Sequence, residues 1–122
     1  MSYKLYLDDV RPIPEGWIGA RSFEEFTDYI KKNGIPSEVS FDHDLKREEY
    51  HIIKDRPANR PLIEFPIDYK SYRVKTGYHC VKWLKAYCER GGKQFPPYNL
   101  HTDNSTGAKN MYNLIEKNIK AD

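Results

Sequence analysis

The sequence has no apolar run long enough to cross a membrane, and it does not open with a signal or transit peptide. Residues 1–4 lead directly into a segment with the character of a strand. These absences argue against a membrane-embedded or secreted protein. We therefore expect a cytoplasmic protein with no membrane partner, and no segment indicates an obligate protein partner.

Cysteine is also scarce, since the chain contains only Cys80 and Cys88. Both lie on one predicted helix, where the helical rise separates them by about 12 Å. That distance is too long for a disulfide between them. We expect two reduced, buried, structural thiols, which suits a cytoplasmic protein.

The chain has almost no excess of charge of one sign. Its 20 Lys and Arg residues against 18 Asp and Glu residues leave a net charge of +2, which is too small to indicate nucleic-acid binding by itself. Internal repeats and low-complexity runs are absent as well. With 122 residues, of which 14% are aromatic, the chain is predicted to form one folded domain.

Short apolar runs alternate with segments of helical period. We expect strands at residues 4–7, 17–21, 38–41 and 98–100, and helices that begin near Ser22, Thr76 and Thr106. Ser22 is a predicted N-cap, and Glu25 is predicted to complete a capping box with it. Strands that alternate with helices predict an α/β fold with a parallel sheet.

Residues 46–75 differ from the rest of the chain. The segment is rich in charged residues, contains three prolines and shows no sustained period. It is too long for an ordinary connection, so it is either a functional lid or a solvated or poorly ordered insertion. Basic and aromatic residues are interleaved in it, which favours contacts with phosphates and bases. Under the lid hypothesis, Arg56 and Arg60 are the expected phosphate contacts.

Polar clusters follow three of the predicted strands, at the ends where ligands bind in parallel sheets. The clusters are Asp8-Asp9, Asp42-His43-Asp44 and His101-Thr102-Asp103-Asn104. Crowded carboxylates repel one another unless a cation or protons intervene, and oxygen-rich sites suit Mg²⁺, Mn²⁺ or Ca²⁺ better than zinc. Taken singly, each cluster is more typical of a turn or a cap. Their coincidence at one edge favours a site for a metal or an anion.

Histidines in two of these clusters carry protons near neutral pH. His43 and His101 lie beside the acidic residues and are candidates for general acid and base. Either residue alone could equally be a structural, hydrogen-bonded histidine. His51 and His79 are not assigned to the site, because His51 lies in the long loop and His79 lies on a helix without a predicted partner.

Four motifs resemble those of the cyclic-phosphate processing receiver-like domain family. They are "LYLDDVRP", "SFDHDL", "TGYHCVKWL" and "HTDN" followed by "TGAKNM", and they occur in the family's order over nearly the whole chain. The resemblance implies a small receiver-like, flavodoxin-like three-layer α/β sandwich. Its sheet would have four parallel strands in the order 2-1-3-4, with residues 46–75 as an enlarged loop.

The likeness to receiver domains also implies positions for individual residues. Asp8 and Asp9 match the acidic pair that binds Mg²⁺, and Asp42 matches the phospho-accepting aspartate. Thr102 falls near the hydroxyl residue of the fourth strand. No fifth strand with the receiver's switching lysine is evident, which argues against a plain signalling receiver.

The resulting prediction is a metal-assisted phosphoesterase that acts on a cyclic phosphate of a nucleotide, an RNA end or an ADP-ribose derivative. Its expected cofactor is Mg²⁺ or Mn²⁺. The predicted roles are metal binding by Asp8, Asp9 and Asp42, proton transfer by His43 and His101 with Asp44 as orienting partner, and phosphate binding by Arg11, Thr102 and Asn104.

Two alternatives remain open at this point. A non-catalytic module that binds a nucleotide or phosphate, or a degenerate receiver that docks a partner, would use the same groups without turnover. A purely structural scaffold is the third possibility. The sequence does not separate these classes, because binding and cleaving a phosphate require nearly the same residues.

Overall fold

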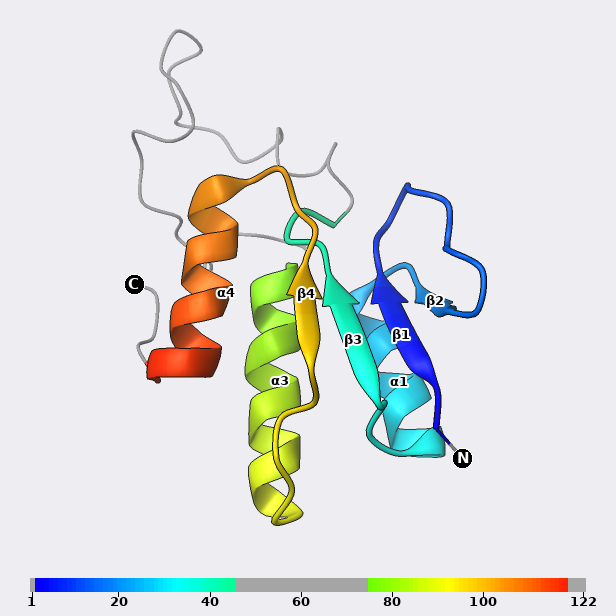
Figure 1. Ribbon diagram of the computed structural model, residues 1–122, viewed down its shortest axis with the longest axis vertical. Helices are drawn as coiled ribbons and strands as arrows, with labels where there is room; N and C mark the ends of the chain where they lie inside the picture. The colour runs from blue at the N-terminus through cyan, green and yellow to red at the C-terminus, as the bar shows by residue number, and fades with distance from the viewer. Residues whose placement is uncertain (1, 46–74, 119–122) are drawn as a thin grey trace, which may run out of the picture.

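The protein is described here by a computed structural model, which covers residues 2–45 and 75–118. Four strands form one parallel sheet in the order β2-β1-β3-β4, as expected (Figure 1). The elements are β1 Lys4–Leu7, β2 Ile18–Ala20, α1 Phe23–Asn33, β3 Glu38–Phe41, α3 Gly77–Arg90, β4 Tyr98–Leu100 and α4 Ser105–Lys117. Because all the strands are parallel, their carboxyl ends lie along one edge of the sheet.

One face of the sheet is apolar and lies against helices. Side chains alternate along a strand, so Leu5 and Leu7 of β1 and Val39 and Phe41 of β3 share a face, and all four are 0% exposed. α1 and α3 connect successive strands in the same direction across the sheet, and right-handed crossovers place both helices on this face. α4 packs on α3.

The opposite face carries Tyr6 and Ser40, which are direct neighbours across β1 and β3. The helices of the described residues all belong to the layer on the apolar face. Within the described residues the arrangement therefore has two layers, and the second helical layer of a three-layer sandwich is not among them. The parallel topology and strand order are confirmed.

Helix caps differ from the prediction in their partners. Ser22 Oγ accepts from Glu25 N, as expected, but the Glu25 carboxylate accepts from Arg21 N at 2.7 Å instead of completing the box on Ser22. His79, which was predicted to have no partner, completes a capping box at the start of α3, because its Nδ1 accepts from Thr76 N at 2.9 Å. Burial, with a smaller contribution from neighbouring lysines such as Lys75, lowers the pKa of His79 to about 4.

Both cysteines are buried, free thiols on α3. Burial raises the pKa of Cys80 and of Cys88, so both are held as neutral thiols. This agrees with the structural role expected for them. None of the described helices combines the length and apolarity needed to cross a membrane.

Candidate functional site

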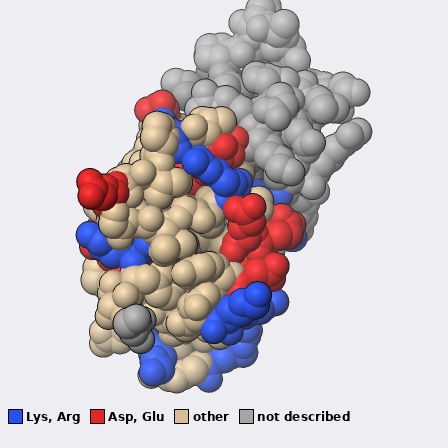
Figure 2. Space-filling model, turned by 90° about the vertical axis from the view of Figure 1, so that its right-hand side faces the viewer, with Lys and Arg blue, Asp and Glu red and all other residues tan. Residues whose placement is uncertain are grey.

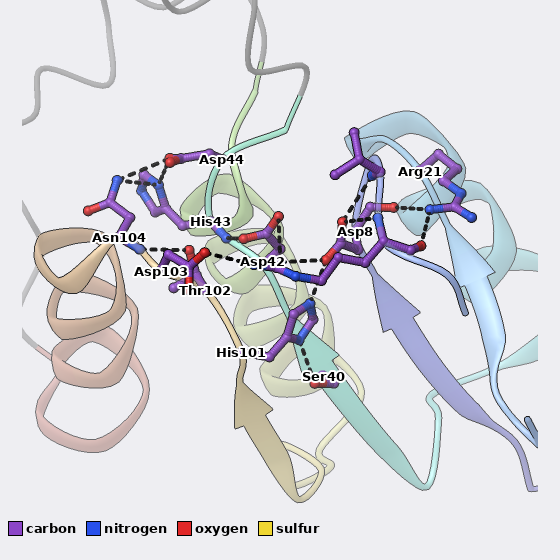
Figure 3. Close-up of polar contacts among 12 residues, drawn as sticks. Asp8, Arg21, Ser40, Asp42, His43, Asp44, His101, Thr102, Asp103 and Asn104 are labelled. Atoms are coloured by element: carbon purple, nitrogen blue, oxygen red, sulfur yellow. Dashed lines mark hydrogen bonds and ion pairs between the residues drawn. The ribbon is translucent and has the colours of Figure 1, made fainter. Parts of the chain in front are cut away.

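Three strand ends meet at one rim of the sheet. The sheet's hydrogen bonding continues one residue beyond β1, β3 and β4, since Asp8 N donates to Ala20 O (3.0 Å), Asp42 N to Leu7 O (3.0 Å) and His101 N to Phe41 O (2.9 Å). The backbone of each rim residue is therefore fixed by a neighbouring strand. Side chains that are far apart in the sequence come together there (Figure 3).

The acidic residues of the rim are close together. Asp8, Asp9 and Asp42 each offer a carboxylate oxygen, and these oxygens lie within 4.8 Å of one another. Asp8 is 0% exposed and Asp42 is 2% exposed. Three carboxylates at this spacing form a donor set that fits a hard divalent cation such as Mg²⁺ or Mn²⁺. The sequence predicted that the three would meet, while their role as metal ligands stays a prediction.

Asp8 accepts four hydrogen bonds. Its Oδ1 accepts from Val10 N (3.0 Å) and Arg11 N (2.9 Å), and its Oδ2 accepts from Arg11 Nη1 (2.8 Å) and His101 Nε2 (3.0 Å). Burial alone would raise the pKa of Asp8, but these donors outweigh it and lower the pKa to about 2. Asp8 is therefore a carboxylate at neutral pH.

Arg11 is the cation that faces this group of carboxylates. Besides Asp8, its Nη1 lies 3.6 Å from Asp42 Oδ2, and its Nη2 donates to Asp103 Oδ2 at 3.1 Å. The pKa of Arg11 is raised, first by its hydrogen bond to Asp8. The sequence predicted that the guanidinium of Arg11 would bind a phosphate. In the structure the guanidinium forms ion pairs with three carboxylates.

Asp42 differs from Asp8 in its electrostatics. Burial raises the pKa of Asp42, and the charge of Asp8 adds to the rise, while the Thr102 hydroxyl partly opposes it by hydrogen bonding. Asp42 Oδ1 also accepts from His43 N at 2.8 Å. Two carboxylates in one site whose pKa values are pushed in opposite directions are typical of functional sites.

His101 is held on three sides. Its Nδ1 lies 2.7 Å from Ser40 Oγ, its Nε2 lies 3.0 Å from Asp8 Oδ2, and its ring stacks on Tyr6 with the ring centroids 4.4 Å apart. Because ionised Asp8 only accepts, Nε2 carries a proton, and in the neutral ring Nδ1 accepts from the Ser40 hydroxyl. The side chain is 17% exposed, so His101 is at the surface of the rim.

His43 points away from these carboxylates and into the protein. It is 0% exposed, and its ring occupies the space beside Gly107 of α4, where an added Cβ would come within 2.4 Å of His43 Cγ. Asp44 Oδ1 lies 2.7 Å from His43 Nδ1, so Asp44 does orient an imidazole as predicted. The contact with Gly107 gives His43 a packing role, while the part of His43 and Asp44 in proton transfer stays a prediction.

Asn104 and Thr102 were both predicted to bind phosphate. Asn104 is the N-cap of α4, with Oδ1 accepting from Gly107 N (2.8 Å) and Nδ2 donating to Asp44 Oδ1 (3.0 Å). The helix consequently begins at Ser105, one residue earlier than expected. Thr102 Oγ1 accepts from Asn104 N at 3.2 Å, so its hydroxyl supports the turn and also faces Asp42.

Two residues of the rim were missed from the sequence. Ser40 orients His101, and Arg21 Nη1 holds the loop after β1 by donating to Asp8 O (3.1 Å) and Arg11 O (2.7 Å). Ser40 was detectable, because strand alternation places it on the same side as a residue two positions later, Asp42. Arg21 follows β2 directly and so lies at the same rim. Arg56 and Arg60 fall outside the described residues.

The surface seen from the right-hand side of Figure 1 carries both signs of charge. At the upper end of the described surface, basic and acidic groups lie next to one another, and no extended basic field is visible on the described part of this face (Figure 2). This intermixing agrees with the net charge of +2.

Comparison with known families identifies the chain. The sequence pattern of the cyclic-phosphate processing receiver domain matches residues 3–117. The chain belongs to this family. No curated protein and no solved structure matches it significantly. The region that matches the cyclic-phosphate processing receiver domain contains the whole rim, from Asp8 to Asn104, and the four-stranded parallel sheet that carries it.

Proposed function

We propose that the rim binds a cyclic phosphate of a nucleotide, an RNA end or an ADP-ribose derivative and hydrolyses it with the help of a divalent cation. The observation that supports this most is the group formed by Asp8, Asp9 and Asp42, with carboxylate oxygens within 4.8 Å, directly beside Arg11 and His101. Membership of a cyclic-phosphate processing family agrees with this chemistry.

Asp8, Asp9 and Asp42 would hold the cation, which we propose to be Mg²⁺ or Mn²⁺. When bound, such a cation neutralises charge on phosphate oxygens and lowers the pKa of a bound water. The low pKa of Asp8 keeps it ionised for this role at any physiological pH. The raised pKa of Asp42 indicates a carboxylate that gains from a nearby positive charge.

Arg11 is placed to bind the phosphate of the substrate. Its guanidinium lies at the rim with its side chain 31% exposed, beside the carboxylates that would hold the cation. A planar fork of N–H donors matches two phosphate oxygens at once. The Thr102 hydroxyl, which faces Asp42, is the further donor near this position.

His101 is the proposed general acid. Hydrolysis of a cyclic phosphate breaks one ester P–O bond and joins a water oxygen to phosphorus, so the leaving oxygen takes up a proton. The Nε2 proton of His101 points at the carboxylates, where the phosphate would approach. Its transfer to substrate would replace the hydrogen bond to Asp8, while Ser40 keeps the ring in place through Nδ1.

One observation favours a second candidate, the non-catalytic binding module. Both ring nitrogens of His101 are engaged, by Ser40 and by Asp8, so the ring contributes to the site even if it never transfers a proton. A protein that only binds a cyclic phosphate would keep the same rim. The two functions differ in the effect of replacing His101.

The test is the His101→Gln variant, with His79→Gln as the matched control, because His79 caps α3 and contacts none of the rim carboxylates in the described structure. If His101 transfers a proton, kcat on 2′,3′-cyclic AMP falls by about 10²-fold or more, while the affinity for the nucleotide changes little. The control keeps its kcat. Equal losses of affinity and rate, with unchanged melting temperatures, would point away from proton transfer by His101. A wild type that binds the nucleotide without turnover, and loses affinity in His101→Gln, would support the binding module.

A further inference from the structure

All the hydrogen-bond acceptor positions of the Asp8 carboxylate are occupied. A carboxylate offers about four lone-pair sites, and Asp8 receives four hydrogen bonds, two on each oxygen. A cation can therefore reach Asp8 only if one of these donors withdraws. This is a consequence of the geometry and does not depend on which divalent cation enters.

The four donors differ in their freedom to move. Two are backbone N–H groups of Val10 and Arg11, in a loop that Arg21 holds through two carbonyl oxygens. The third is His101, which is fixed by Ser40 and by the Tyr6 stack. The fourth is the guanidinium of Arg11, on a long, flexible side chain that is 31% exposed.

We propose that Arg11 is an exchangeable counter-cation: it leaves the carboxylates of Asp8 and Asp42 when a divalent cation enters, and its guanidinium then binds the phosphate of the substrate. This inference rests on the metal site of the proposed function and deepens it. Arg11 thereby couples the binding of the cation to the binding of the phosphate.

Charge explains why the exchange is obligatory. Arg11 Nη1 lies 2.8 Å from Asp8 Oδ2 and 3.6 Å from Asp42 Oδ2, so it occupies the space between two of the proposed ligands. A divalent cation there would repel the guanidinium at close range, beside two carboxylates that are shielded from water. A phosphate beside the cation gives the displaced guanidinium a new anionic partner. Arg11 therefore opposes the cation when phosphate is absent, and the cation promotes phosphate binding.

The first measurement is calorimetric titration of Mg²⁺ into the wild type, Arg11→Gln and Arg21→Gln. Arg21 is the matched control, because it lies at the same rim directly after β2 but donates only to backbone carbonyls among the described contacts. We expect Arg11→Gln to bind Mg²⁺ roughly tenfold more tightly than the wild type, and Arg21→Gln to change affinity much less. With Mg²⁺ present, Arg11→Gln should bind 2′,3′-cyclic AMP roughly tenfold more weakly.

The second measurement uses the wild type alone, in case Arg11→Gln does not fold without its counter-cation. In ¹⁵N-resolved NMR spectra, the backbone amide signals of Asp9 and Asp42 should shift until Mg²⁺ saturates the site. The side-chain Nε–H signal of Arg11 should shift over the same range of Mg²⁺ concentration. The Arg21 signal should stay in place. An Arg11 signal that does not move while those amides do overturns the exchange and leaves the metal site intact.

The outcomes for the inference and for the metal site are distinct. Equal Mg²⁺ affinities for the wild type and Arg11→Gln, or equal gains in both arginine variants, overturn the exchange but not the proposed function. Absence of Mg²⁺ and Mn²⁺ binding in the wild type and in Arg11→Gln overturns the metal site and the exchange together. Binding by Arg11→Gln alone supports the exchange in its strongest form.

Discussion

Asp8 Oδ2 and His101 Nε2 lie 3.0 Å apart although 93 positions separate the two residues in the sequence. The contact joins the ends of β1 and β4, which do not neighbour each other in the sheet, across the end of β3. It adds to the larger effects of the Arg11 and Val10 donors, which lower the pKa of Asp8. It also sets the tautomer of His101 and brings an imidazole to a cluster of carboxylates. The proposed chemistry depends on this one relationship.

Ser40→Ala should reduce turnover, because His101 loses the hydroxyl that holds its Nδ1 at 2.7 Å. Partners that orient a functional histidine typically contribute about tenfold or more. The expected cost in stability is only about 1 kcal/mol. The measurement is kcat on a cyclic phosphate together with urea unfolding, and Ser40→Thr should recover most of the rate. Unchanged kcat in Ser40→Ala would show that the ring is positioned by other contacts.

Asp42→Asn should stabilise the protein when divalent cations are removed with EDTA at pH 7. The pKa of Asp42 is raised, so the folded state binds its proton more tightly than the unfolded chain. Ionised Asp42 therefore costs stability above its folded pKa, and this cost disappears as the pH falls below the unfolded value. We expect a gain of about 1 kcal/mol, since asparagine keeps the acceptor for His43 N.

Mg²⁺ should make the wild type more stable than Asp42→Asn, the reverse of the order of stabilities in EDTA. Only the folded protein has the site, so Mg²⁺ raises the melting temperature of the wild type by mass action, while Asp42→Asn gains less. Thermal scans in EDTA and in millimolar Mg²⁺ measure both effects. A variant that is less stable than the wild type in EDTA would contradict the electrostatic cost assigned to Asp42.

His79 should make stability depend on pH through the cap of α3. Its pKa is lowered to about 4, so the unfolded chain, with a pKa of about 6.5, takes up a proton first as the pH falls. The wild type should therefore lose on the order of 2 kcal/mol between pH 6.5 and pH 4 from this group. His79→Gln keeps an acceptor for Thr76 N and should lack this part of the slope. Parallel curves of unfolding free energy against pH for the two proteins would contradict the assignment.

Gly107→Ala tests the packing role of His43. The new methyl group would lie 2.4 Å from His43 Cγ, so we expect a loss of about 2 kcal/mol in the free energy of unfolding. In a His43→Ala background the ring is gone and the same substitution should cost little. Urea unfolding of the wild type, the two single variants and the double variant gives the coupling energy between His43 and Gly107 directly. Additive losses would mean that His43 and Gly107 do not share one space.

Much of the fold was predictable because local signals agreed with one another. The bounds of β1, β3 and β4 were predicted correctly, since each is a short apolar run that ends at polar or turn residues. The meeting of the acidic groups followed from the parallel sheet. The start of α4 was placed one residue late, because Asn104 was interpreted as a ligand and not as a cap.

The rest of the site required tertiary contacts. The direction of the His43 side chain is decided by the space that Gly107 leaves, and nothing in the local sequence encodes that contact. The cap formed by His79 was missed because histidine stands where a capping box usually has Glu or Gln. The engagement of Arg11 by Asp8 and Asp103 was likewise invisible, because the sequence does not show which anion is nearest.

The most direct test of the proposed activity is a ³¹P NMR time course of the purified protein with cyclic phosphates. The substrates are 2′,3′-cyclic AMP, an RNA oligonucleotide with a 2′,3′-cyclic phosphate end and a cyclic phosphate of ADP-ribose. With Mg²⁺ or Mn²⁺, the cyclic signal of at least one should be replaced by that of a phosphomonoester, and EDTA or His101→Gln should abolish most of the conversion. Persistence of all three cyclic signals with either metal would contradict hydrolysis at this rim and leave it as a binding site.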